Sequence, residues 1–180
     1  VWCRSGSTGD AGMKSGLTIR EDNYSVVLDA LKQLSGTDVL VGIPAGPPRD
    51  DAPLSNAELG YLQSTGATVE IDGETVTLPP RPFLDMGIED SRDKTTERLK
   101  LAAQSALEGK ADVASMHLES AGQIARDASK AVIEAGDRLT PLSEKTIKKR
   151  REMKPPILGD KPLRARGFLF RAIQYVVRKK

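Results

Sequence analysis

Apolar residues recur along the chain with different spacings, and each spacing predicts its own kind of element. Between Asn23 and Leu34 they fall every three or four positions, which predicts an amphipathic helix with an Asn23 N-cap and a stop at Gly36. Residues 37–43, TDVLVGI, are β-branched and almost continuously apolar, which predicts a strand covered on at least one face. Four prolines within residues 44–53 exclude both helix and strand, so we expect a surface loop.

The next stretch combines a short helix with a hairpin. Ser55 and Glu58 have the spacing of a capping box, which predicts a helix that ends at Gly66. Apolar and polar residues then alternate on both sides of Asp72-Gly73, a dipeptide favoured in two-residue hairpins. The alternation predicts a polar face of Thr68, Glu70, Thr75 and Thr77 and an apolar face of Val69, Ile71, Val76 and Leu78. We expect the apolar face to pack on its own domain or to serve as a subunit interface.

A proline-rich loop follows the hairpin. Three prolines between residues 79 and 82 restrict the backbone around Arg81 and predict an extended, rigid presentation of Phe83 and Leu84. We expect Arg81 and Phe83 to fix the joint between the hairpin and the helix that comes next.

Two long helices are predicted in the second half of the chain. The first covers residues 90–108, with an inward face of Leu99, Ala103, Ala106 and Leu107. The second covers residues 112–135, with a narrow inward stripe of Val113, Met116, Ser120, Ile124, Ala128, Ala131 and Ala135. Gly122 lies within it and indicates a close approach of another backbone, at some cost in helix stability.

The last part of the chain is broken by prolines into short elements. A helical turn is predicted to start at residues 140–143, and a brief helix around Leu169 is predicted to lead into a strand over residues 174–177. The expected fold is α+β, with a small antiparallel or mixed sheet that includes the hairpin, two long helices packed against it, and a basic C-terminal extension. Residues 1–16 are rich in Gly and Ser and are expected to be a flexible leader or a tag, so residues 17–180 form the single domain.

Charge is divided unevenly along the chain. Residues 137–180 hold 14 basic and 4 acidic residues, a net charge of +10, whereas the preceding residues hold 13 basic and 21 acidic residues, a net charge of −8. Such a molecule attracts DNA, an acidic protein, or the acidic part of another copy of itself. The basic residues considered as contacts to an acidic partner or to DNA are Lys145, Lys148, Lys149, Arg150, Arg151 and Lys154.

Motifs for catalysis are not found. The chain has no GxSxG, HExxH, paired-cysteine or Walker motif, and its adjacent acids in loops and first helical turns are typical of solubility and dipole effects. His117 is the only histidine and Cys3 the only cysteine, so we expect no metal site, no cofactor and no disulfide, and an intracellular origin. No apolar run is long enough to span a membrane. We therefore expect a structural protein and not an enzyme.

Four segments carry a resemblance to a known family. They are NAELGYLQSTGA at 56–67, LPPRPFLDMGI at 78–88, TPLSEKTIKKR at 140–150 and KPLRARGFLFRAIQYVV at 161–177. With these segments, residues 37–177 resemble the tail-completion or neck proteins of tailed bacteriophages, and the most specific part is the loop of residues 80–84.

The resemblance implies a structural virion protein, made in the host cytoplasm, that joins or closes the tail at the head–tail junction or at its upper end. It implies a homo-oligomeric ring of the hexamer or dodecamer class. Such a ring would contact portal or adaptor proteins, tail-tube or terminator proteins, and the genomic DNA in the channel. In such an assembly Trp2 would anchor the leader on a neighbouring subunit. The alternative, drawn from charge alone, is an accessory protein that binds DNA non-specifically through residues 145–154.

Overall fold

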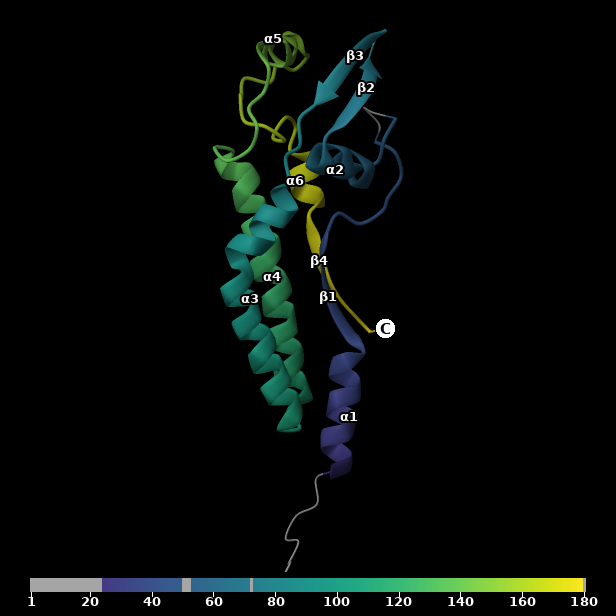
Figure 1. Ribbon diagram of the computed structural model, residues 1–180, viewed down its shortest axis with the longest axis vertical. Helices are drawn as coiled ribbons and strands as arrows, with labels where there is room; N and C mark the ends of the chain where they lie inside the picture. Colours follow the sequence, from purple (N-terminus) through teal and green to yellow (C-terminus); the bar gives the residue numbers. More distant parts are fainter. Residues whose placement is uncertain (1–23, 50–52, 72, 180) are drawn as a thin grey trace, which may run out of the picture.

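The computed structural model describes residues 24–49, 53–71 and 73–179. It is an elongated α+β molecule with two long helices along one side and shorter elements along the other, so the predicted fold class is confirmed (Figure 1). The elements are α1 (Tyr24–Ser35), β1 (Thr37–Gly42), α2 (Asn56–Thr65), β2 (Ala67–Ile71), β3 (Glu74–Leu78), α3 (Phe83–Leu107), α4 (Ala111–Ala135), α5 (Glu144–Glu152), α6 (Phe168–Ala172) and β4 (Gln174–Lys179).

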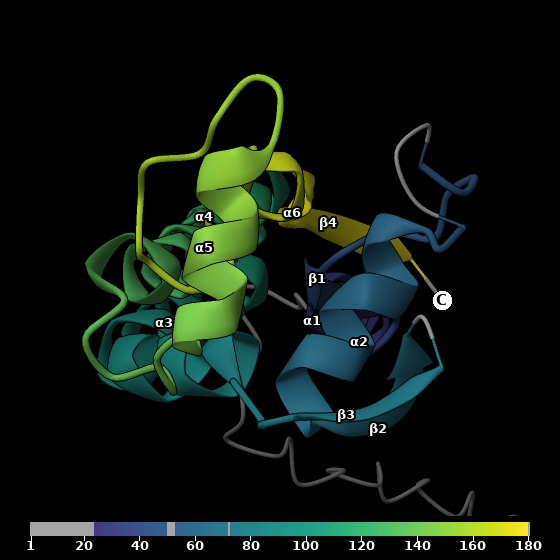
Figure 2. The ribbon, with the colours of Figure 1, turned by 90° about the horizontal axis from the view of Figure 1, so that it is seen from above.

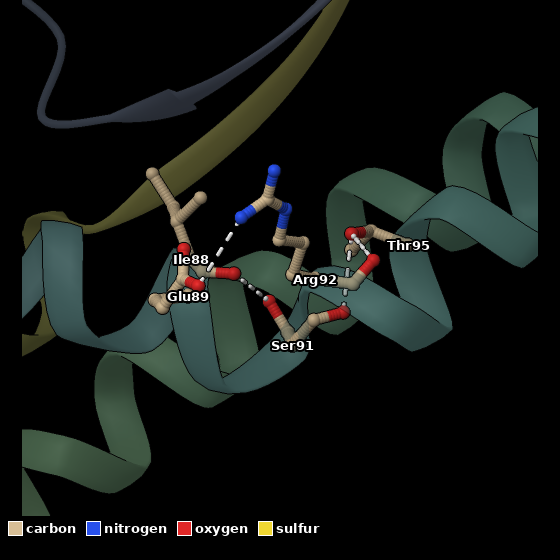
Figure 3. Close-up of polar contacts among 5 residues, drawn as sticks. All are labelled: Ile88, Glu89, Ser91, Arg92 and Thr95. Carbon is tan, nitrogen blue, oxygen red and sulfur yellow. Dashed lines mark hydrogen bonds and ion pairs between the residues drawn. The ribbon is translucent and has the colours of Figure 1, made fainter.

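Helices α3 and α4 pack along each other as a helical hairpin (Figure 1). Small residues make this possible. An added Cβ at Gly87 would lie 2.3 Å from the Ser129 Cα, so the two backbones touch where any larger residue would separate them. The buried serines of this contact satisfy their hydroxyls within their own helix. Ser91 Oγ donates to the Gly87 carbonyl at 2.9 Å, and Ser129 Oγ donates to the Ala125 carbonyl at 2.9 Å. Ser91 Oγ also lies 3.1 Å from the Ile88 carbonyl, a contact that Figure 3 shows beside those of Thr95 and Arg92.

Strands β1 and β4 form a two-stranded antiparallel sheet that packs on α4. Its register runs from Thr37 opposite Lys179 to Gly42 opposite Gln174. A Cβ at Gly122 of α4 would lie 2.5 Å from Tyr175 Cδ2 of β4, so the close approach at Gly122 is made by a side chain and not by the backbone that we expected.

Strands β2 and β3 form a second, separate antiparallel sheet. Val69 lies opposite Val76 and Ile71 opposite Glu74, which leaves two residues for the turn, as predicted. The hairpin projects beyond α2 at the upper end of the molecule, next to α5 (Figure 1). It does not extend the β1–β4 sheet.

The hydrophobic core lies at the end of the molecule where α3 begins and α4 ends. Phe83, Ile133 and Ile173 have no exposed surface and pack with Val132, Leu139 and Leu169. The expectation of an extended Phe83 is wrong, because Phe83 is the first residue of α3. Pro82 is the N-cap, where the missing amide of a proline costs no hydrogen bond, so the proline loop starts a helix.

Two details of the long helices also differ from the prediction. Helix α3 begins at Phe83 and not at residue 90, and Leu99 and Leu107 are 43% and 45% exposed. In α4 the expected stripe is rotated by about one position, because Met116 is 69% exposed. The buried face consists mainly of small residues: Ala114, Leu118, Ala121, Gly122, Ala125, Ser129, Val132 and Ile133. Close packing on α3 and on the β1–β4 sheet selects these small side chains over larger apolar ones.

The remaining predicted elements are confirmed. Helix α1 and strand β1 lie at the expected positions, although β1 ends one residue early and the expected N-cap Asn23 lies outside the described residues. Helix α2 has the capping box in which Ser55 Oγ accepts from the Glu58 amide and the Ser55 amide donates to the Glu58 carboxylate. The expected helical turn after residue 140 is α5, with Ser143 as its N-cap. The brief helix and final strand are α6 and β4.

Candidate functional site

Arg81 connects three separate parts of the upper end of the molecule. Its side chain is 5% exposed and donates from Nε to the Thr140 carbonyl at 2.7 Å, from Nη2 to the Pro141 carbonyl at 3.1 Å and from Nη1 to Gln63 Oε1 at 3.0 Å. Its backbone amide donates to the Gln63 carbonyl at 2.8 Å. Arg81 therefore holds the C-terminal end of α2, the start of α3 and the segment before α5 together.

Arg150 is the second buried arginine at this end. It lies on the inward face of α5, is 8% exposed, and donates from Nη1 to the carbonyls of Lys161 at 3.0 Å and Gly159 at 3.4 Å. The backbone carbonyl of Arg150 accepts from the Ile157 amide at 2.9 Å. These bonds tie α5 to the loop that leads to α6.

A groove of about 560 Å³ lies between β3, α2, α5 and the residues that lead into α6, and both arginines line it. Figure 2 looks down on this end, with α5 and α2 on opposite sides and β3 at the lower edge of the view. We call this groove the arginine groove. Its walls are largely apolar and include Leu59, Val76, Leu78, Leu142, Leu163 and Leu169.

The charge of the arginine groove is unbalanced. Its described lining residues include Arg49, Arg81 and Arg150 but no aspartate or glutamate. In the described part of the chain the acceptors of Arg81 and Arg150 are carbonyl and amide oxygens, with no carboxylate among them. Burial lowers the pKa of both side chains, and the nearby charge of Arg81 lowers the pKa of Arg150 further. The groove thus holds buried positive charge that the described residues do not neutralise.

The hairpin residues selected from the sequence lie beside this groove. Val69, Val76 and Leu78 are half-buried, and the polar face opposite them is exposed. Val76 and Leu78 line the groove. Nothing is described for the side chain of Ile71, and Trp2 lies outside the described residues.

The basic residues selected from the sequence divide into two groups. On α5 and just after it, Lys145, Lys148, Lys149, Arg151 and Lys154 are exposed. Arg150 is buried and belongs to the groove instead. Sequence reasoning missed this difference, because Arg150 and Arg151 lie three and four residues after Ile147 and both spacings share its helix face.

Within residues 24–49, 53–71 and 73–179, no cluster of three or more His, Cys, Asp or Glu side chains could hold a metal ion. None of the helices in the same ranges is both long enough and apolar enough to cross a membrane. Comparison of the chain with protein-family models, with curated proteins and with solved structures gives no match. The function is therefore argued from the residues and their arrangement.

Proposed function

We propose that the protein is a structural component of a tailed-bacteriophage virion, without enzymatic activity. In this proposal it forms a ring at the head–tail junction or at the upper end of the tail and joins or closes the tail. The observation that carries the proposal is the β2–β3 hairpin, which projects from the end of the molecule with a half-buried apolar face. A two-stranded hairpin is marginal by itself, and an unpaired strand edge readily pairs with another chain.

Two features of the sequence support an assembly of identical subunits. The loop of residues 80–84 and the three segments around it resemble tail-completion and neck proteins. The division of charge, with +10 in residues 137–180 and −8 before them, favours head-to-tail contacts between copies. Head-to-tail contacts close into rings when the rotation between subunits allows it.

The ring proposal is tested by light scattering and negative-stain microscopy of the purified protein and by locating it in virions. We expect rings, and we expect Val69→Lys on the apolar hairpin face to weaken them. Thr77→Lys adds the same charge on the exposed face and is the matched control. A protein that stays monomeric at every concentration and is absent from virions would contradict the proposal.

The exposed basic face of α5 supports a second candidate function, non-specific DNA binding. Lys148 and Arg151 are three residues apart and share an exposed face of α5. Exposed positive side chains of this kind can contact phosphates. We expect affinity for a DNA duplex to fall steeply with salt, and a double change of Lys148→Gln and Arg151→Gln to reduce the salt slope by about 2. Undetectable binding at about 0.15 M salt would rule this function out.

A further inference from the structure

We propose that the arginine groove binds an extended segment of another protein chain that carries a carboxylate between apolar side chains. The carboxylate would lie against Arg81 and Arg150, and the flanking side chains would lie against the leucine-rich walls. The inference goes beyond the ring proposal, because the groove is formed within a single chain.

The first argument is the hydrogen-bonding capacity of the two arginines. A guanidinium has five N–H donors. Among the described residues, Arg81 donates three hydrogen bonds and Arg150 donates from Nη1 alone, which leaves N–H groups of both side chains for a ligand. A buried charge without a counter-ion is costly, and a carboxylate is the protein group whose geometry best matches a guanidinium.

The second argument is the edge of β3. Val76, Thr77 and Leu78 are consecutive and alternate between the two faces of the hairpin, yet all three line the groove. The groove therefore runs along the edge of the strand. Among the described residues β3 pairs only with β2, so its other edge can accept an added strand.

The third argument favours a protein segment over nucleic acid. The arginines are more than nine-tenths buried, and the walls are largely apolar. A phosphodiester backbone is strongly hydrated and is normally met by exposed cations, which this chain presents on the outer face of α5. A protein segment in which a carboxylate alternates with apolar residues can place the carboxylate against the arginines and the apolar side chains against the leucines.

The experiment uses the full chain and an array of acetylated, amidated pentapeptides. The central residue is Asp, Asn or Lys, and the flanking positions vary among Val, Leu, Thr and Ser. We expect the best Asp peptides to bind at least about tenfold more tightly than the same sequences with Asn, since hydrogen bonds to a charged group are the stronger kind. In NMR spectra the amide signals of residues 76–78 should shift on binding. Equal affinity for Asp and Asn peptides, or no binding by any peptide, would overturn the proposal.

Two variants separate the groove from general electrostatic attraction. Arg150→Gln removes the buried charge, and we expect it to weaken Asp-peptide binding by about tenfold. Lys94→Gln removes the same charge from an exposed position of α3 that does not line the groove, and it should leave the affinity unchanged. Equal weakening by both variants would overturn the proposal. If Arg150→Gln does not fold, the comparison of Asp and Asn peptides on the unaltered chain still decides the question.

A DNA duplex and inorganic phosphate are tested in parallel. Displacement of the Asp peptide by either one, with loss of that displacement in Arg150→Gln, would assign the groove to phosphate and contradict the proposal. Because peptide binding is measured on single chains, its failure can be told apart from failure to form rings.

Discussion

At the scale of single residues, Gly87 and Gly122 determine how closely α4 is approached from its two sides. An added Cβ at Gly87 would lie 2.3 Å from Ser129 Cα, and one at Gly122 would lie 2.5 Å from Tyr175 Cδ2. The obstacle at Gly87 is backbone, which cannot move aside without separating the helices. At Gly122 the obstacle is the side chain of Tyr175, which can shift with less disruption than a helix backbone, so we expect alanine to be tolerated better at Gly122 than at Gly87.

Gly87→Ala is therefore expected to destabilise the protein. Alanine is the better helix former by about 1 kcal/mol, but forcing the α3 and α4 backbones apart costs more, and we expect a net loss of about 1–3 kcal/mol in the free energy of unfolding. Urea unfolding of both proteins measures this difference in the free energy of unfolding. Gly46→Ala is the control, since an added Cβ there meets nothing within 4 Å. A Gly87→Ala protein as stable as the original would mean that the helices do not touch at this point.

Glu58 predicts a pH dependence for α2. The Ser55 amide and hydroxyl both donate to its carboxylate at 2.8 Å, which holds the pKa of Glu58 below its ordinary value of 4.5. A lowered pKa in the folded state means that the charged form stabilises the fold above the ordinary value and loses this effect as pH falls through the folded value. We expect the stability difference between the original protein and Glu58→Gln to shrink from about pH 6 to about pH 3. Amide exchange in α2 at both pH values measures the difference, and a difference independent of pH would contradict this role.

At the scale of elements, local patterns predicted most of the short pieces. The capping box at Ser55, the two-residue hairpin turn and the final strand depend on neighbours in sequence, and they lie where expected. The start of α3 and the inward face of α4 depend on what packs against them. Met116 is larger than Ala114, but Ala114 lies on the face of α4 that packs against its neighbours and is buried, whereas Met116 points away from it.

The arginine groove could be predicted only in part. The proline loop pointed to Arg81 as a joint, and the hairpin pattern selected Val76 and Leu78, which both line the groove. Arg150 was expected among exposed basic residues, because a run of four positive charges is normally solvated. Its burial comes from the loop carbonyls of Gly159 and Lys161, and no local pattern places that loop over α5.

The hairpin predicts a local effect of substitution at its turn. Gly73 has a φ of 78°, which a β-branched residue adopts only with strain. We expect Gly73→Val to destabilise the hairpin by about 1–2 kcal/mol while α3 and α4 keep their protection, because β2 and β3 join no other sheet. Native-state hydrogen exchange measures the protection of the hairpin amides and of the α3 and α4 amides separately. Thr75→Val puts the same side chain at an ordinary strand position and serves as the control, and equal loss of protection in both regions would show that the hairpin is part of the main cooperative unit.

At the scale of the whole molecule, the separation of charge predicts that self-association depends on salt. Residues 137–180 carry +10 and the preceding part −8, so contacts between unlike regions of two copies weaken as ions screen them. We expect the assembled fraction to fall between about 0.05 M and about 0.5 M salt, where the screening length shortens several-fold. Sedimentation velocity at several salt concentrations measures this fraction. Assembly that strengthens with salt would mean that the apolar contact of the hairpin, and not the attraction between unlike charges, dominates the interface.

The pairing of β1 with β4 has a consequence for the order in which the protein is built. Thr37 and Lys179 lie opposite each other in the register, although almost the whole described chain separates them in sequence. A ribosome makes β1 long before its partner, whereas α3 and α4 follow each other directly and need only a short loop to meet. The helical hairpin is therefore expected to form before the β1–β4 sheet, because β1 has no β4 to pair with until the end of the described chain has been made. We expect the sheet to close onto helices that are already paired.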